Sequence, residues 1–237
     1  MLWLFRGVIQ SLPLCLSFPA LGIEQHLGIL GDLSISGSLI PKSRWTFQSD
    51  LLVGAVSASP STTSKSDDLR FSVTGSYNSI GYRFTPTQSV SMGYGLQYVQ
   101  APLAAQPTFE NRIWQQYTFE HSSEYGLFKL SSRLEERAIN LAPGAAVRSR
   151  FLLQFNYPLT PSFYLVAAEE YFVNLNSVSW GPIAGFDQNR AFFGAGYWLD
   201  DQYRLELGYL NNYINRDLVQ DLSVDFIALN FYLNLED

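Results

Sequence analysis

Runs in which apolar and polar residues alternate follow one another along most of the chain. In the run His26 to Ile40, Leu27 and Ile29 fall on one face of an extended segment, and Ser34 and Ser36 fall on the other. Alternation with a period of two is typical of a β-strand with one apolar and one polar face. About eleven such runs predict an all-β chain. They are 26–40, 45–53, 69–84, 90–98, 110–121, 125–137, 148–157, 163–174, 190–199, 203–213 and 222–235.

Short and long connections alternate between these runs. The short turns lie at Pro41, Pro86, Ser122, Pro158 to Ser162 and Asp200, and the long loops begin near Ser57, Ala101, Asn140, Leu175 and Asn215. Outer-membrane barrels have short periplasmic turns and longer extracellular loops, so this rhythm predicts a transmembrane antiparallel up-and-down β-barrel. Because single-chain bacterial barrels have even strand numbers, we expect about ten to twelve strands. Twelve is preferred, with the segment after Gly22 as the additional strand.

The segment Glu110 to Arg137 shows the two faces most clearly. If the chain reverses in the middle of this segment, Glu110 lies opposite Arg137 and Arg112 lies opposite Glu135. Opposite-charge pairs across two strands help to set the register of a hairpin. The other face of the same hairpin carries aromatic and aliphatic residues, so one face is ionic and the other is apolar.

Two other segments predict local details of the strands. The hairpin that turns at Asp200 pairs Phe193 with Tyr209. In the run 69–84 the alternation changes phase near Asn78, which predicts a β-bulge there. A face of small residues follows and predicts a roomy lumen on this side. Its members are Ser79, Gly81, Ser89, Ser91, Gly93 and Gly95.

Aromatic residues flank the short turns and predict the periplasmic girdle of a membrane barrel. They are Trp45, Tyr82, Phe84, Phe119, Tyr125, Tyr157, Phe163, Tyr197 and Tyr203. The alternative is a soluble ligand-binding barrel with its faces reversed, whose apolar side chains fill the interior while its arginines face water. Such barrels usually have about eight strands, fewer than the runs counted here, and do not need an aromatic girdle.

The charged residues of the strands are predicted to face the lumen. An arginine on the lipid face at mid-membrane costs about 2–4 kcal/mol, so a membrane barrel keeps these side chains inside. Ion pairs that stiffen and fill a closed lumen are one expected role. The other is an arginine-rich constriction of a small passive or gated channel that selects anionic solutes. The predicted lumen network comprises Glu110, Arg112, Arg133, Glu135, Arg137, Arg148, Arg150, Glu170, Arg190 and Glu206.

The first 22 residues read as a signal peptide that directs export to the outer membrane. Arg6 supplies the positive charge, the segment 8–18 is mostly apolar, and Ala20 and Gly22 are small residues at the positions that a signal peptidase reads. An N-terminal membrane anchor is the alternative, but the apolar run is shorter than the about 20 residues of a spanning helix. We therefore expect a leader at 1–22 and a barrel domain at 23–237.

Charge and cysteine content limit the classes of partner and the covalent chemistry that are expected for the mature chain. Removal of Arg6 with the leader leaves 14 Lys and Arg against 21 Asp and Glu, a net charge of −7, which argues against nucleic acid. The single cysteine, Cys15, also lies in the leader, so disulfides are excluded. The sequence contains no run of 18 apolar residues, so no membrane-spanning helix is predicted. We expect lipids and lipopolysaccharide of the outer membrane, the barrel-assembly machinery and small anionic solutes as partners, and no cofactor or metal.

An enzymatic role is not predicted. His121, Ser123 and Glu135 have a spacing similar to that of the triad of outer-membrane lipid A deacylases. In the predicted hairpin, however, Glu135 lies about 30 Å along the sheet from His121, at about 3.4 Å per residue. The other histidine, His26, is expected to be exposed. No nucleophile elbow, zinc spacing or phosphate loop is present, so a lipid-modifying enzyme is the weakest of the three functions considered.

Six motifs resemble, in this order, the bacterial family catalogued as domain of unknown function 2490. They are E-N-R-I-W-Q-Q (110–116), R-L-E-E-R (133–137), R-S-R-F-L-L-Q (148–154), E-E-Y-F-V-N-L-N (169–176), F-D-Q-N-R (186–190) and L-E-L-G-Y-L-N-N-Y (205–213). The resemblance covers nearly the whole mature chain and implies an outer-membrane barrel of unassigned activity. Such chains usually carry an aromatic residue at or near the C-terminus for barrel assembly. Here Leu235-Glu236-Asp237 ends the chain, so Phe231, Leu233 and Leu235 would have to serve.

Overall fold

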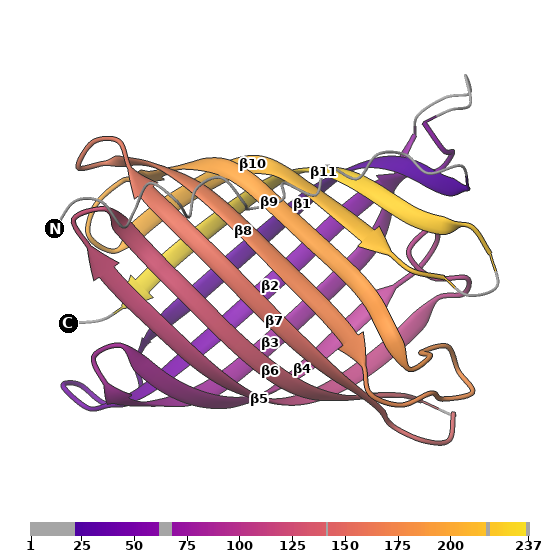
Figure 1. Cartoon of the computed structure of the whole chain (residues 1–237), viewed down its shortest axis with the longest axis horizontal. Coiled ribbons are helices and arrows are strands. Elements are labelled where there is room, and N and C mark those ends of the chain that lie inside the picture. The colour runs from indigo at the N-terminus through magenta and orange to yellow at the C-terminus, as the bar shows by residue number, and fades with distance from the viewer. Residues whose placement is uncertain (1–21, 62–67, 141, 217–218, 236–237) are drawn as a thin grey trace, which may run out of the picture.

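The computed structural model describes residues 22–61, 68–140, 142–216 and 219–235. Within these ranges the chain forms eleven β-strands and no helix, and the strands join into one closed barrel (Figure 1). The strands are β1 (Ile23–Ser38), β2 (Trp45–Ser57), β3 (Leu69–Thr85), β4 (Gln88–Val99), β5 (Thr108–Ser123), β6 (Gly126–Ile139), β7 (Ala146–Pro158), β8 (Phe163–Asn174), β9 (Gly185–Trp198), β10 (Tyr203–Ile214) and β11 (Asp221–Leu235). The all-β barrel is therefore confirmed. Residues 1–21 of the predicted leader lie outside the described residues.

No helix among the described residues is long and apolar enough to cross a membrane. Every strand instead pairs with two neighbours, and each pair that is consecutive in sequence is antiparallel.

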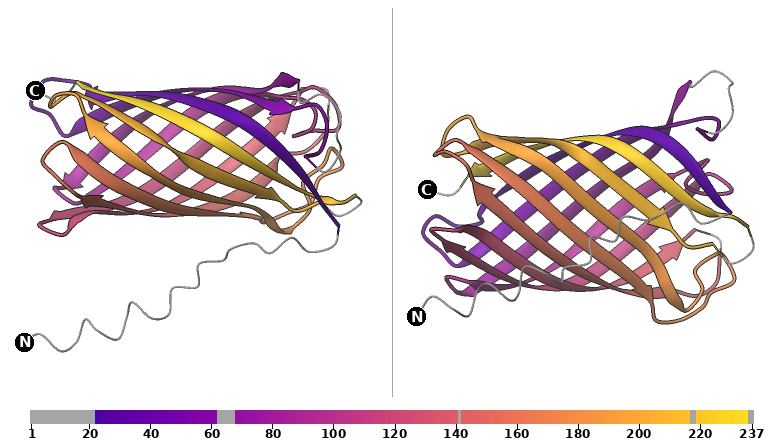
Figure 2. Two further views of the ribbon diagram at one scale, coloured as in Figure 1. Left: turned by 90° about the horizontal axis from the view of Figure 1, so that it is seen from above. Right: turned by 45° about the horizontal axis from the view of Figure 1, so that its top comes forward.

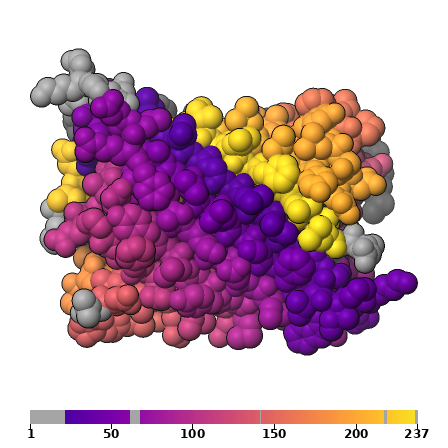
Figure 3. Space-filling model, turned by 180° about the vertical axis from the view of Figure 1, so that it is seen from behind, coloured from indigo at the N-terminus to yellow at the C-terminus, as the bar shows by residue number. Residues whose placement is uncertain are grey.

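The barrel closes through a parallel pair. β1 runs parallel to β11, from Ile23 opposite Asp221 to Gly37 opposite Leu235. Figure 2 shows these first and last strands side by side, and Figure 3 shows them meeting along a diagonal seam. An odd number of up-and-down strands leaves the first and the last running the same way. The preferred count of twelve was therefore wrong, and the residues after Gly22 begin β1 instead of forming a strand of their own.

The two faces of the sheet lie as predicted for the membrane barrel and not for the soluble one. Large apolar side chains are exposed around the outside, for example Ile113 at 57%, Phe193 at 61% and Ile227 at 59%. Arg112 and Arg148 lie in the interior, where they are 7% and 3% exposed. The arginines therefore point into the barrel, away from the apolar outer surface.

The register of the hairpin 110–137 differs from the prediction by two residues. Glu110 lies opposite Ile139 and Arg112 lies opposite Arg137, because the turn is a tight one after Ser123. A shift by two keeps every side chain on its predicted face, since side chains alternate with a period of two. The hairpin around Asp200 has the predicted register throughout, with Phe193 opposite Tyr209 and Arg190 opposite Asn212.

The bulge of β3 lies at Ser72 and not at Asn78, where pairing with both neighbours is continuous. The register shifts where Gly54 and Ala55 of β2 face Val73 and Phe71, so Ser72 is the extra residue. Its buried hydroxyl donates to the carbonyl oxygen of Ala101 at 3.1 Å. A second shift lies between Arg83 and Thr85. The change of phase was therefore read correctly from the sequence but placed six residues too late.

The small residues of β4 make room for aromatic rings as well as for open space. A Cβ at Gly93 would overlap the ring of Trp114 and would lie 2.6 Å from the carbonyl oxygen of Asn78. A Cβ at Gly95 would overlap the ring of Tyr77. The predicted roomy side of the lumen is thus partly filled by two rings that lie against glycines.

Gly93→Ala is expected to lower the free energy of unfolding by about 1–3 kcal/mol, because overpacking forces side chains or backbone to move. The carbonyl oxygen of Asn78 belongs to the sheet and cannot move freely. Gly31→Ala is the control, since its Cβ would meet nothing closer than the carbonyl oxygen of Val53 at 3.9 Å. Urea titration of the refolded barrel would compare them, and equal midpoints would contradict this account of Gly93.

Candidate functional site

The lumen carries an ionic wall built by β5 to β9. Glu110 of β5 binds Arg137 of β6, with Oε2 and Nη2 2.8 Å apart, and it also pairs with Arg112 on its own strand. The Glu110–Arg137 bond was predicted, and it forms diagonally because of the shifted register, whereas the bond to Arg112 was not predicted. Arg112 therefore binds Glu110 and not Glu135.

Glu135 is the centre of the ionic wall. It is 1% exposed and binds Arg148, and its Oε2 lies 3.4 Å from Nη1 of Arg150. Arg150 continues the chain to Glu170 at 2.7 Å, and Arg148 continues it to Asp187 at 2.8 Å. Glu135, Arg148, Arg150 and Glu170 were all predicted members of the lumen network, whereas the sequence reasoning missed Asp187. It precedes the inward-facing Gln188 at a shift in the β8–β9 pairing, which alternation alone does not reveal.

The aromatic ring of Phe172 lies against three arginines of the ionic wall. Phe172 is fully buried, and the guanidinium carbons of Arg148, Arg150 and Arg190 lie 4.8, 4.7 and 5.0 Å from its ring centre. Guanidinium groups are attracted to the face of an aromatic ring, most strongly where water is excluded. Phe172 thus stabilises three like charges that would otherwise repel one another.

Two of the predicted network residues have mainly neutral partners. Arg133 donates to Gln116 at 2.7 Å and lies 4.8 Å from the ring centre of Trp114. Glu206 is 2% exposed and accepts hydrogen bonds from the hydroxyls of Tyr164 and Tyr232, at 2.7 and 3.0 Å. Glu206 lies on β10, away from the ionic wall, so the ten predicted residues do not form one continuous cluster.

An apolar wall faces the lumen from the other side of the barrel, and the sequence reasoning missed it. Its buried members come from β2 and β11, and four partly buried residues pack against them. The signal was present: Leu222, Val224, Phe226 and Ala228 alternate along β11 and give it an apolar inner face. The wall comprises Val56, Leu222, Val224 and Phe226, with Leu30, Leu103, Leu210 and Ile214.

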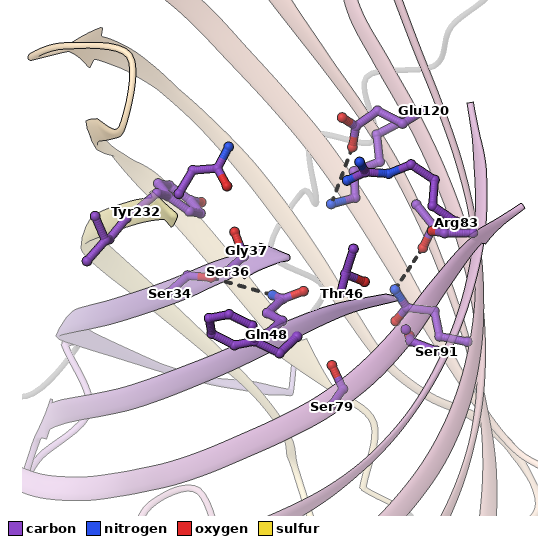
Figure 4. Close-up of a pocket in the computed structure, with 18 of the residues that line it drawn as sticks. Ser34, Ser36, Gly37, Thr46, Gln48, Ser79, Arg83, Ser91, Glu120 and Tyr232 are labelled. Atoms are coloured by element: carbon purple, nitrogen blue, oxygen red, sulfur yellow. Dashed lines mark hydrogen bonds and ion pairs between the residues drawn. The ribbon is translucent and has the colours of Figure 1, made fainter. Parts of the chain in front are cut away.

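The described residues line two cavities inside the barrel that share no lining residue. The larger one, about 460 Å³, lies at the short-turn end and is called here the vestibule. Figure 4 shows its hydroxyl and amide side chains, such as Ser34, Gln48 and Ser91. The smaller one, about 150 Å³, lies toward the long-loop end between the ionic and apolar walls, and is called here the chamber.

Buried side chains separate the vestibule from the chamber. On β5, Arg112 lines the chamber and Gln116 lines the vestibule, so Trp114 between them lies in the barrier. Trp114, Glu135 and Phe172 line neither cavity and are at most 3% exposed. These three side chains thus occupy the lumen between the two cavities.

His26 is buried, and the expectation of an exposed histidine was wrong. It is 1% exposed; its Nδ1 lies 2.8 Å from the carbonyl oxygen of Ser57 and its Nε2 lies 2.9 Å from Glu24. Glu24 also pairs with Arg216 at 3.3 Å, which in turn donates to the carbonyl oxygen of Pro102. Burial lowers the pKa of Arg216, and its ion pair with Glu24 opposes this shift. These groups connect β1, the end of β2 and two long loops at the mouth.

Ser57, His26 and Glu24 resemble a catalytic triad only in composition. Ser57 Oγ is 3.3 Å from Nδ1, but that nitrogen also faces the Ser57 carbonyl, and the Ser57 hydroxyl donates to the carbonyl of Ser59 at 3.0 Å. Ser57 is 2% exposed. The arrangement therefore fits a structural connection and not a nucleophile that a substrate reaches.

The structure does not bring His121, Ser123 and Glu135 together. His121 lies opposite Phe128 near the turn, whereas Glu135 lies opposite Trp114 in the lumen. Among the described residues, no group of three or more His, Cys, Asp or Glu side chains is arranged to hold a metal ion.

Comparison with known proteins gives a family but no activity. The family model described as Protein of unknown function (DUF2490) matches residues 32–222, which confirms the resemblance seen in the six motifs. An uncharacterized protein of Methylorubrum extorquens is 33% identical over 130 residues, which are 52% of this chain and 56% of that protein. The chain thus spans about half the length of the curated relative that it matches. No solved structure shows significant similarity.

Proposed function

Because the chain belongs to the family described as Protein of unknown function (DUF2490), which names no activity, we propose a function from the geometry of its barrel. The protein is a closed barrel of the bacterial outer membrane, exported by its leader. It is a structural or surface-interaction protein that presents its long loops outward, and it does not catalyse a reaction. The observation that carries this proposal is the barrier of ion-paired and aromatic side chains between the vestibule and the chamber.

The outer surface supports membrane embedding. Exposed apolar side chains occur on every strand, whereas soluble monomers rarely expose contiguous apolar patches above a few hundred Å². Aromatic rings gather near the short turns, as in the contacts of Trp45 with Tyr82 and of Phe163 with Tyr197. Aromatic side chains favour the membrane interface, and short turns face the periplasm in such barrels. The long loops then face outward, toward lipopolysaccharide.

The interior supports a closed barrel over an open pore. Glu110, Glu135 and Glu170 each bind two arginines, so ion pairs hold these charged side chains to one another across the strands. Trp114 and Phe172 fill the space between these pairs. An ion that crossed would have to displace several of these contacts together.

A gated anion-selective channel is the second candidate. The vestibule lies at the short-turn end and the chamber toward the long-loop end, and Arg112 and Arg190 line the chamber. Rings of positive charge select anions in channels. Side-chain movement in the barrier would join the cavities.

Planar-bilayer recording separates the two candidates. The closed barrel is expected to give no steady conductance in the wild-type protein, whose folding is checked by heat-modifiable gel mobility. Discrete anion-preferring openings whose selectivity changes in Arg112→Ala would instead support the channel. Arg44→Ala is the matched control, because Arg44 lies at a short turn, where it donates to the carbonyl oxygen of Phe84 at 3.5 Å.

A further inference from the structure

One arginine of the vestibule lies between two aromatic rings. Arg204 of β10 pairs with Trp198 of β9 on one side and with Tyr232 of β11 on the other. The guanidinium carbon of Arg204 lies 4.0 Å from the ring centre of Tyr232 and 5.3 Å from that of Trp198. All three side chains line the vestibule, and they are called here the Arg204 cluster.

Neighbouring side chains hold the two rings in place. The Tyr232 hydroxyl donates to Oε2 of Glu206 at 3.0 Å, and the ring of Trp198 lies against that of Tyr164, with ring centres 6.3 Å apart. Tyr164 in turn donates to Oε1 of Glu206 at 2.7 Å. A guanidinium group held between two fixed rings has already lost conformational freedom on folding. Less entropy is therefore lost when a ligand binds to it.

The hydrogen-bond donors of Arg204 are not used within the described part of the chain. Its guanidinium group makes no hydrogen bond there, and no carboxylate oxygen lies within 4.0 Å of its nitrogens. Rings cover the faces of a guanidinium group, whereas its N–H donors point outward in its plane. The side chain is partly exposed to the vestibule, so these donors are accessible to a ligand.

The rest of the vestibule offers mainly hydroxyl and amide groups. Ser34 of β1 lies opposite Tyr232, and Gln48 of β2 donates to Ser34 at 3.5 Å (Figure 4). Ser36, Thr46, Ser79 and Ser91 add further hydroxyls. Among the described residues, the charged lining consists of three cations and one carboxylate, namely Arg83, Lys129, Arg204 and Glu120. The cavity is therefore both positively charged and rich in groups that bind hydroxyls.

The size and chemistry of the vestibule limit the ligand. Its volume of about 460 Å³ lies within the range of about 300–1,000 Å³ that is usual for small-molecule sites. A guanidinium group matches the geometry of a carboxylate or a phosphate with two parallel hydrogen bonds. A neutral sugar would leave Arg204 without an anion, and an anion without hydroxyls would leave the polar wall to water.

We propose that the vestibule binds a small polyhydroxylated anion, a sugar that carries one carboxylate or one phosphate. Its anionic group accepts from the N–H donors of Arg204, and its hydroxyls bond to Ser34, Ser36 and Gln48. The turn residue Gln202 borders the vestibule, so the ligand enters from the short-turn end. This inference goes beyond the proposed function, because it requires neither a closed lumen nor membrane embedding.

Isothermal titration calorimetry of the refolded full chain in detergent micelles tests the proposal, with sodium glucuronate and glucose 6-phosphate as separate probes. We expect saturable one-to-one binding of at least one probe, weakened about tenfold or more in Arg204→Gln, since hydrogen bonds to a charged group are lost. Arg44→Gln is the matched control, because it removes an arginine at a short turn outside the cavity lining.

A filling variant tests the site without removing a charge. Ser36→Trp places a large ring in the vestibule and should abolish binding. Its control is Leu33→Trp on the same strand, where the side chain is 36% exposed on the outer face. Heat-modifiable gel mobility shows whether each variant is folded.

Each result has a defined meaning. Weakened binding in Arg204→Gln and Ser36→Trp, with both controls within about threefold of the wild type, supports the site, and the tighter probe shows whether carboxylate or phosphate is preferred. Absence of saturable heat with both probes overturns the proposal, as does undiminished binding in folded Arg204→Gln or Ser36→Trp. Glucose has the hydroxyls without the charge and acetate has the charge without the hydroxyls, and equal affinity for either would also overturn it.

Discussion

Glu135→Ala is expected to lower the free energy of unfolding by about 3–5 kcal/mol, the cost of removing one partner from a buried ion pair. Glu135 is 1% exposed and binds both Arg148 and Arg150. Arg148 would retain Asp187 and Arg150 would retain Glu170, but both would lose the carboxylate between them. The two guanidinium carbons lie 4.8 and 4.7 Å from the ring centre of Phe172, and the repulsion between these groups would no longer be balanced by the carboxylate.

Urea titration followed by heat-modifiable gel mobility measures this effect. Glu136→Ala is the control, because it removes the same side chain one position along β6, where the residue is exposed on the outer face. Glu136→Ala should leave the midpoint nearly unchanged. Similar midpoints for both variants would show that the lumen network does not stabilise the barrel.

A disulfide is expected to form across the barrel seam in the double variant Ile29→Cys with Ile227→Cys. These residues are directly opposite in the parallel pair of β1 and β11, and both point outward. Neighbouring strands lie about 4.8 Å apart, within the range of Cα separations that a disulfide spans. The single native cysteine, Cys15, lies in the predicted leader and does not compete after its removal.

The control is Ile29→Cys with Phe231→Cys. Phe231 lies opposite Leu33, four residues farther along the seam, or about 13 Å at 3.3 Å per residue. Thiols at that separation cannot bridge without backbone movement. Non-reducing gels of the oxidised protein would show the bond, and cross-linking of the control pair or of neither pair would contradict the register.

Much of the barrel is predictable from local alternation, because the pattern within one strand assigns its residues to the inner and the outer face. The register of the hairpin around Asp200 was predicted correctly, because its turn is short and polar. One register alone places Phe193 opposite Tyr209 and Gly194 opposite Gly208. The inward placement of Arg112 and Glu135 follows from the same alternation. The charges on one face were sufficient to indicate a lumen network.

What alternation does not define is the relation between strands. Moving the hairpin 110–137 by two residues preserves both faces, so pattern alone does not distinguish the two registers. The parallel seam joins the first and the last strand, and no local sequence feature of β1 or β11 predicts this pairing. The burial of His26 depends on Ser57, 31 residues away, and on the turn of two long loops toward it.

The odd number of strands also determines where a fused segment would be delivered. β1 starts at the long-loop rim, beside Asp221, whereas β11 ends at the opposite rim, where Asn234 binds the backbone of Gln202. In an even-stranded barrel both ends return to one rim. In the proposed orientation a peptide joined ahead of Ile23 would be displayed to the surroundings of the cell, and one joined after Leu235 would remain in the periplasm.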